Sequence, residues 1–377
     1  MVRLRVLFFA LVPLLASYSA MAGNFAVGTC KPRLTSFSTI SDAVSSVPPG
    51  STIEVCPGVY PEQITISQPL TLEGIANDNQ DQIVIAVPIV GLTTNLTSIF
   101  TEPVAAQVLV QNAGPVNITN IVVDGTGGDQ GCGTSSIWLA GIFYASSSSG
   151  DVNRVRASGQ TDEGCGVGIW AENGDSSNQL VTIEHSSIHD VDGAGIFAGS
   201  GSTPTLTAIV KDNFVSMRSG PTGIVANSVN GAITENNVSD ALAGIFDAAP
   251  GTRVSSNTVT NTTFGVLLLT GGTVQSNDVS NSGYGVFLNA DGAVVQSNHI
   301  TLAASAGIEL NCHGGTVSRN TINDAAVGLD QVPLGFRGSN TFANTGSIST
   351  DGCAAAAPRT VSPQQWRTPA TPLGVRK

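Results

Sequence analysis

The chain has 377 residues, a formal net charge of −12 and a sequence pI near 4.6. Lysine occurs only at Lys31, Lys211 and Lys377. So acidic a chain is unsuited to binding nucleic acid or other polyanions, which bind to basic surfaces. Length alone would suggest two domains, but the repeats described below favour one.

The first 22 residues are predicted to be a secretory signal peptide. Arg3 and Arg5 precede an apolar run at residues 6–16, and Ala20-Met21-Ala22 supplies a small-residue cleavage site. The protein is therefore expected to be secreted or periplasmic. No later stretch is long and apolar enough to cross a bilayer, so we expect no transmembrane segment in the mature chain.

Export permits disulfides, and the number of cysteines is even. The six cysteines fall into three local pairs, which predicts the bonds Cys30–Cys56, Cys132–Cys165 and Cys312–Cys353. Zinc binding is the alternative, but no Cys-x-x-Cys or His-x-x-x-His spacing supports it. We therefore predict no metal site at these residues.

Residues 38–47 are predicted to form a short amphipathic helix. A capping Ser38 precedes apolar residues at helical spacing, and Pro48-Pro49-Gly50 ends the pattern. Such a helix would cover the open N-terminal end of a stack of strands, whose unpaired edge would otherwise favour aggregation.

Two repeats run through the chain. An Asn followed two residues later by an apolar residue recurs at Asn120, Asn153, Asn213, Asn236, Asn257, Asn277, Asn298, Asn320 and Asn340, with Ser186 in the place of one Asn. From Asn213 onward the step is 20 to 23 residues. A second series pairs Gly with an aliphatic residue, from Gly141-Ile142 to Gly328-Leu329. This period predicts a β-solenoid in which successive Asn side chains stack.

The N-terminal block resembles the first coils of the pectate-lyase-like right-handed parallel β-helix superfamily. The resemblance is carried by the helix, by an I-x-V-x-P-G-x-Y-x-E run at residues 53–62 and by Leu70-Thr71-Leu72-Glu73-Gly74. It implies an all-β, single-stranded parallel β-helix, which we assign to residues 23–353. Residues 354–377 contain four prolines without periodicity and are predicted to be a flexible tail. The superfamily includes many enzymes and also proteins without known catalysis, so the resemblance selects no reaction.

The regular spacing breaks between Asn120 and Asn213, where long loops are expected. The interval from Asn to Gly is usually 8 to 10 residues, yet 21 separate Asn120 from Gly141. The interval from Gly to Asn is usually 12 or 13, yet 18 separate Gly195 from Asn213. Long loops on both borders of one strand would form the walls of a groove over residues 120–213, with Cys132–Cys165 joining two loops of one wall.

The residue after each inward aliphatic side chain should point outward. Five of these residues are aromatic: Phe143, Trp170, Phe197, Phe246 and Phe287. Copies about 4.8 Å apart would form an apolar stripe, on which the sugar rings of an extended polysaccharide could stack. The alternatives are that a loop, the C-terminal tail or a second subunit covers the stripe, or that a one-residue shift makes it part of the core.

Four carboxylates in the long coils are candidate catalytic residues: Asp162, Glu163, Glu172 and Asp192. Two carboxylates that flank a glycan groove are the minimum for acid/base cleavage, and Asp162 with Asp192, or Glu163 with Glu172, would supply such a pair. Alternatively, these acids are only solvated, or they bind Ca²⁺. We therefore predict no cofactor other than, at most, Ca²⁺.

The specific motifs of polygalacturonases, pectin methylesterases and pectate lyases are absent, so the sequence leaves the chemistry open. It predicts an exported β-helix protein that binds an extended polysaccharide, with lyase, glycoside hydrolase or epimerase activity as candidates. The alternative is a non-catalytic surface or periplasmic structural or interaction protein whose apolar stripe docks a partner or its own tail. The N-terminal block is also similar to the β-helix factor associated with copper insertion into nitrous oxide reductase, but three Met and four His make copper binding a weaker interpretation.

Overall fold

A computed structural model describes residues 21–76, 82–201, 203–333, 338–350 and 353. The predicted signal peptide, except for its last two residues, and the predicted tail at 354–377 lie outside these residues. Among the described residues, no helix has the length and apolar character needed to span a membrane.

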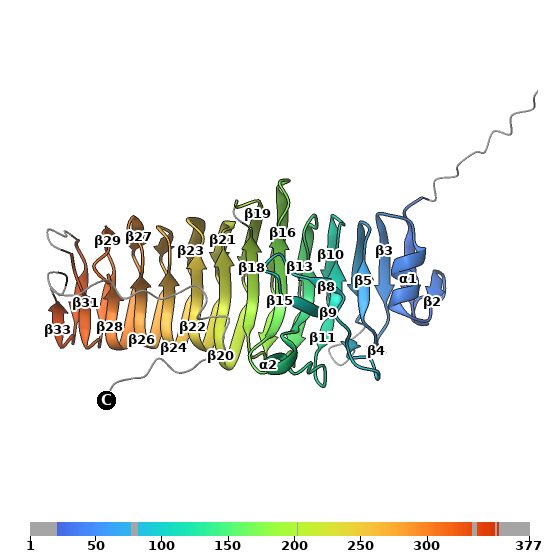
Figure 1. Ribbon diagram of the computed structural model, residues 1–377, viewed down its shortest axis with the longest axis horizontal. Helices are drawn as coiled ribbons and strands as arrows, with labels where there is room; N and C mark the ends of the chain where they lie inside the picture. Colours follow the sequence, from blue (N-terminus) through green and yellow to red (C-terminus); the bar gives the residue numbers. More distant parts are fainter. Residues whose placement is uncertain (1–20, 77–81, 202, 334–337, 351–352, 354–377) are drawn as a thin grey trace, which may run out of the picture.

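The molecule is an elongated stack of coils that runs from helix α1 at one end to strand β33 at the other (Figure 1). One sheet has 13 strands, and its parallel strands run along the whole stack. These strands are β1 (Asn24–Val27), β2 (Thr35–Phe37), β3 (Ser51–Val55), β6 (Leu70–Gly74), β10 (Val116–Thr119), β13 (Gly150–Asn153), β16 (Gln179–Glu184), β19 (Leu206–Lys211), β21 (Asn230–Thr234), β23 (Gly251–Ser255), β25 (Thr273–Gln275), β27 (Ala293–Gln296) and β29 (Gly315–Ser318).

The second sheet has 20 strands. They are β4 (Gly58–Pro61), β5 (Ile64–Ile66), β7 (Ile83–Ala86), β8 (Leu96–Thr97), β9 (Pro103–Val110), β11 (Val122–Asp124), β12 (Trp138–Tyr144), β14 (Arg156–Ser158), β15 (Gly166–Asn173), β17 (Ser187–His189), β18 (Ala194–Ser200), β20 (Phe214–Asn227), β22 (Asn237–Ala248), β24 (Thr258–Leu268), β26 (Asp278–Leu288), β28 (His299–Glu309), β30 (Thr321–Asn323), β31 (Val327–Asp330), β32 (Thr341–Ala343) and β33 (Ser347–Ser349). Among the described strands, β8 and β9 form the one antiparallel pair.

Inward aliphatic side chains fill the solenoid, as the alternating pattern predicts. Ile142, Ile169 and Ile196 are paired in register on successive coils and are fully buried in the interior. The repeated Gly before each of them has a packing reason. A Cβ atom at Gly195 would lie 2.4 Å from Val215 Cγ1 and 2.7 Å from the Gly223 carbonyl oxygen, so no larger residue fits there without a shift.

The asparagines from Asn213 to Asn340 form a ladder, as predicted, and all of them except the half-buried Asn340 are buried. In each step, the backbone N–H and the side-chain Nδ2 of one Asn donate to Oδ1 of the Asn on the following coil; for Asn236 and Asn257 both distances are 2.9 Å. Ser186 continues the ladder, because its N–H donates to Asn213 Oδ1 and its hydroxyl accepts from the Val155 N–H.

The two predicted rungs upstream of Ser186 are wrong. A residue with positive φ precedes each rung from Ser186 to Asn320, and the corresponding residues in the two upstream coils are Arg154 and Asn120. Val155 therefore occupies the ladder position in one coil, two residues after the predicted Asn153. Ile121 occupies it in the coil before, one residue after the predicted Asn120. Because Val and Ile have no side-chain amide, the ladder of polar side chains ends at Ser186.

Helix α1 (Ile40–Ser46) lies at the N-terminal end of the stack and packs on β1, β2, β3 and β5, as predicted (Figure 1). Its N-cap is Thr39, one residue after the predicted Ser38, and the Thr39 hydroxyl accepts from the Asp42 N–H. The Glu62 carboxylate accepts from the N–H groups of Ile40 and Ser41 at 2.9 and 2.8 Å, which fastens the start of the helix to the first coils.

All three predicted disulfides are present. They join Cys30 to Cys56, Cys132 to Cys165 and Cys312 to Cys353, with Cα–Cα distances of 5.7, 6.1 and 5.3 Å. Disulfides persist in oxidising compartments, so these bonds are consistent with an extracytoplasmic location.

Candidate functional site

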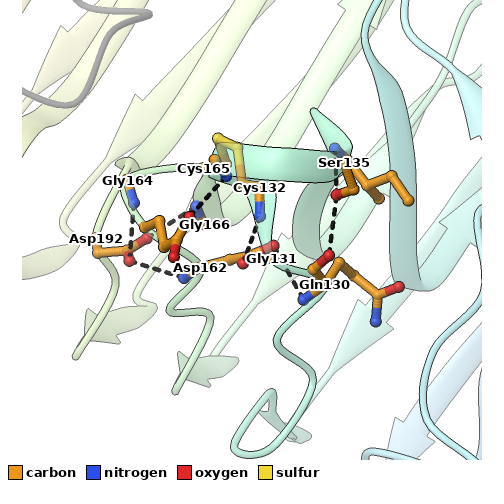
Figure 2. The surroundings of a disulfide bond; sticks show 12 residues. Gln130, Gly131, Cys132, Ser135, Asp162, Gly164, Cys165, Gly166 and Asp192 are labelled. Carbon is orange, nitrogen blue, oxygen red and sulfur yellow. Dashed lines mark hydrogen bonds between the residues drawn. A yellow bond between two sulfur atoms is a disulfide. The ribbon is translucent and has the colours of Figure 1, made fainter.

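Two long loops form one wall beside strands β12, β15 and β18. The first joins β11 to β12 and contains the short helix α2 (Cys132–Ser135), and the second joins β14 to β15. The Cys132–Cys165 disulfide connects them across neighbouring coils, as Figure 2 shows. This linked wall is the one that the irregular spacing predicts.

Asp192 holds the second of these loops in place. Its carboxylate accepts hydrogen bonds from the backbone N–H groups of Asp162, Gly164 and Gly166 at 2.7, 3.0 and 2.9 Å (Figure 2). These three hydrogen bonds fix the position of the carboxylate. The carboxylate is thereby used to shape the loop around Cys165.

Asp162 performs the same task one coil earlier. Its side chain is 1% exposed, and its oxygens accept from the N–H groups of Cys132 at 3.0 Å and Gln130 at 3.2 Å. Burial raises the pKa of Asp162 to about 6, and a hydrogen bond to Asp129 adds to the rise. The same hydrogen bond lowers the pKa of the exposed Asp129.

Glu163 also binds the first loop, since its carboxylate accepts from the Gly133 N–H at 2.7 Å. Asp192, Asp162 and Glu163 thus form a chain of contacts in which each coil fastens the loop of the coil before it. The structure brings Asp192 and Asp162 together through the Asp162 backbone. Their predicted acid and base roles stay a prediction, and these contacts lend them no support.

Glu172 lies at the far end of β15, away from this chain of contacts. Its side chain is 2% exposed, and its carboxylate accepts from the Ser98 hydroxyl at 2.7 Å and the Ile99 N–H at 3.0 Å. Burial raises the pKa of Glu172 to about 7. Glu163 binds Gly133, whereas Glu172 binds the segment around Ser98. The structure therefore gives the two members of the predicted acid and base pair Glu163 and Glu172 different partners.

The aromatic row points out of the solenoid interior, as predicted. Phe143, Trp170 and Phe197 are in register on successive strands, with ring centroids 5.0 and 5.2 Å apart. They belong to an apolar cluster separate from the interior. All five predicted sugar-binding residues are nevertheless buried: Phe143 is 0%, Phe197 2%, and Trp170, Phe246 and Phe287 are each 3% exposed.

A loop covers part of this row, which was one of the alternatives left open by the sequence. The hairpin formed by β8, its turn and the start of β9 places Phe100 edge-on against Phe197, with centroids 5.5 Å apart. Trp138 lies against Trp170 at 5.8 Å. As the structure stands, a sugar ring would reach Trp170 or Phe197 only after the covering side chains moved.

The sequence reasoning missed Asp247, a fully buried acid on β22. It occupies an inward position whose neighbours in register are Ala226 and Leu268, both in the solenoid interior. One carboxylate oxygen accepts from the Ala249 N–H at 3.0 Å, and burial raises the pKa of Asp247 to about 7. The alternating pattern of β22 contained the signal, because it places Asp247 on the same side as Ile245.

The model of one protein family, described as periplasmic copper-binding protein (NosD), matches residues 207–345, which is less than half of the chain. No curated protein sequence matches the chain. In the described part of the matched coils, His299 contacts Asp278, His313 contacts Asp291, and Cys312 is in a disulfide. Among the described residues, no group of three His, Cys, Asp or Glu side chains could hold a metal ion. We therefore derive no copper chemistry.

Solved structures with similar folds include two of the GH136 lacto-N-biosidase from Eubacterium ramulus. The native protein gives a TM-score of 0.54 at 11% identity and covers 85% of this chain and 68% of its own. The selenomethionine derivative gives 0.50 at 12%, covering 86% and 67%. DFA-IIIase from Arthrobacter chlorophenolicus A6, without its lid, gives 0.46 at 14%, covering 87% and 95%. At such identities the likeness concerns the fold alone, and the fold is the predicted right-handed parallel β-helix.

Proposed function

We propose that the protein is an exported β-helix that binds an extended polysaccharide over the coils of residues 120–213. The supporting observation is the row of Phe143, Trp170 and Phe197, which lies outside the solenoid interior beside a wall of long, disulfide-linked loops. Flat ring faces complement the C–H faces of sugars. Successive coils repeat at about 4.8 Å, so the row follows the long axis and suits an extended chain.

The proposal is binding rather than cleavage. A general acid or base must reach a proton on the substrate, either directly or through one water molecule. The four candidate carboxylates instead accept hydrogen bonds from loops of the protein itself. The contacts of Asp162, Glu163 and Asp192 support a firmly held wall of loops beside the binding surface. The fold is also one on which a lacto-N-biosidase is built, which suits a carbohydrate ligand.

The test is retention on an array of neutral and acidic polysaccharides and oligosaccharides of graded length, using the chain from residue 23 onward. We expect longer chains to be retained and Trp170→Ala to weaken retention by tenfold or more, on the order of the stacking energy of one aromatic ring. Phe264→Ala, in the same cluster but beyond the long-loop coils, is the matched control. If no glycan is retained, or if Trp170→Ala binds as well as the unaltered protein, the proposal fails.

A second candidate is an interaction protein whose stripe docks a partner or its own tail. The observation in its favour is that the same apolar cluster continues past the long-loop coils to Phe246 and Phe287. Removal of residues 354–377 followed by an apolar-dye assay distinguishes the two. A large gain in dye binding would favour docking of the tail.

A further inference from the structure

The hairpin over the aromatic row differs from the rest of the molecule. It is antiparallel, with Leu96 opposite Val104 and Thr97 opposite Pro103. Its turn is closed by hydrogen bonds from the Ser98 N–H to the Glu102 carbonyl at 2.8 Å and from the Thr101 N–H to the Ser98 carbonyl at 2.9 Å. Thr101 has a φ of +73°, an unfavourable conformation for a β-branched residue.

The base of this hairpin is firmly attached. The Asn95 side chain exchanges two hydrogen bonds with the backbone of Ala106, at 2.9 and 3.0 Å, and the Asn95 N–H donates to the Val104 carbonyl at 3.0 Å. Both partners lie on β9, which is paired with β12. The base therefore belongs to the stack of coils.

The tip reaches over the site. Ser98 and Ile99 donate to the Glu172 carboxylate, and Phe100 rests on Phe197. Gly199 makes room for the Phe100 ring, because a Cβ atom there would lie 2.8 Å from Phe100 Cζ. A base tied to β9 and a tip held over the site by side-chain contacts are the geometry of a hinged cover.

Glu172 gives the reason to expect movement. Burying a carboxylate under a loop costs free energy unless hydrogen bonds compensate, and an apolar side chain would fill this place at less cost. Two of the hydrogen bonds that hold Glu172 come from the hairpin itself. Once the tip moves away, the carboxylate stands beside the two rings, where it can accept hydrogen bonds from sugar hydroxyls.

We propose that the tip of this hairpin, residues 97–102, forms a lid that opens to expose Trp170, Phe197 and Glu172, and that access of the glycan to this subsite depends on its opening. Control of glycan access rests on the proposed function, whereas opening of the lid does not. The lid regulates a site that is otherwise preformed on the rigid strands β15 and β18.

A designed disulfide can lock the lid. A Cβ atom at Gly174 would lie 3.5 Å from Ile99 Cβ, which is within the range that disulfides span. The variant Ile99→Cys/Gly174→Cys should therefore be closed when oxidised, as shown by the loss of two free thiols. Each single cysteine variant is a control for the substitutions themselves.

The readout is modification of carboxyl groups by a water-soluble carbodiimide and an amine, mapped by peptide mass spectrometry. Glu172 under the hairpin and Asp247 in the solenoid interior are both buried, so Asp247 serves as an internal reference for the reaction of Glu172. We expect Glu172 to react at least about tenfold faster than Asp247, because local opening is far more frequent than unfolding of the core. Oxidation of the double variant should slow the Glu172 reaction to the rate of Asp247.

Phe100→Ala provides a second test that does not depend on the disulfide. Loss of the contact with Phe197 should speed modification of Glu172 by several fold, whereas Thr97→Ala, an exposed change on the same hairpin, should not. If Glu172 reacts as slowly as Asp247 in the unaltered protein and in Phe100→Ala, the hairpin is a fixed part of the fold and the lid is refuted.

Glycan retention separates the two proposals. If the unaltered protein retains a polysaccharide and the oxidised lock lowers that retention about tenfold or more, both parts of the lid proposal are supported. Equal retention by the locked and unlocked forms would overturn the lid as a gate but leave the proposed function intact. Opening of the lid without retention of any glycan would count against the proposed function alone.

Discussion

Asp247 shows what a single buried acid does to this fold. It stands where neighbouring coils carry Ala226 and Leu268, and it replaces apolar contact with one hydrogen bond to the Ala249 N–H. Its pKa is raised to about 7 in the folded protein, so the folded state binds a proton more tightly than the unfolded chain. A proton held only by the folded state stabilises that state at low pH.

We expect this to appear in the pH dependence of the free energy of unfolding. The contribution of Asp247 is greatest below about pH 4, is lost as the pH rises toward about 7, and amounts to on the order of 4 kcal/mol. Asp247→Asn should remove this contribution to the pH dependence of the free energy of unfolding. Urea unfolding of both proteins at pH 5 and pH 8 measures it. Glu172 and Asp162 also lower the free energy of unfolding as the pH rises, so only the difference between the two proteins reports on Asp247. If the free energy of unfolding falls by the same amount from pH 5 to pH 8 in both proteins, the assignment to Asp247 is wrong.

The asparagine ladder gives a second prediction for a single residue. Asn236 is buried, and its Oδ1 accepts from both the N–H and the Nδ2 of Asn213, whereas the adjacent Asn237 is exposed. Asn236→Ala should lower the free energy of unfolding by about 2 to 4 kcal/mol, because donors on the preceding coil lose their acceptor inside the protein. Asn237→Ala is the control and should stay within about 0.5 kcal/mol. Chemical denaturation would show whether the two differ.

The ladder also shows where sequence reasoning reaches its limit. From Asn213 onward the spacing is uniform, so each rung could be placed from the sequence. In the longer coils, Asn120 and Asn153 fit the sequence pattern, but Ile121 and Val155 occupy the rungs. The residue before each of these rungs has a positive φ, and this residue is an Asn in one coil and an Arg in the other. Spacing in a lengthened coil does not specify which residue takes the turn.

At the scale of elements, the loops of the long coils depend on carboxylates more than on apolar packing. Asp192→Asn keeps the size of the side chain but leaves one acceptor oxygen for three backbone donors. We expect the amide hydrogens of Asp162, Gly164 and Gly166 to exchange about tenfold faster or more, as measured by hydrogen exchange. Asp151→Asn, an exposed change on β13, should leave them unchanged. Equal rates in the Asp192 variant would show that the disulfide alone holds the loop.

The elements also differ in how far they could be predicted. The helix at residues 40–46 follows from a local pattern and a cap, and the wall at Cys132 and Cys165 follows from the excess length of two coils. The hairpin at residues 95–104 carries no such signal, because its register depends on contacts with Glu172 and Phe197, which lie more than seventy residues away in sequence. The sequence therefore left open whether the aromatic row is exposed or covered, and the hairpin covers part of it.

At the scale of the molecule, the N-terminal end of the stack depends on one helix for protection. Helix α1 covers the N-terminal end, and Glu62 fastens its first turn. Glu62→Ala should loosen α1 and expose the edge of the first coils, so we expect concentration-dependent self-association by light scattering. Ser46→Ala, at the exposed end of the same helix, is the control. A variant that stays monodisperse at high concentration would show that the cap does not depend on Glu62.

The hydrogen bonds of the ladder all point the same way, since the amide groups of each rung donate to the oxygen of the rung that comes next in the sequence. During synthesis from the amino end, the last folded rung would therefore have two N–H donors, on its backbone and its side chain, without an acceptor. The next coil would then supply the acceptor oxygen. The direction of this single line of amide groups is therefore compatible with assembly in the order of synthesis, one coil at a time.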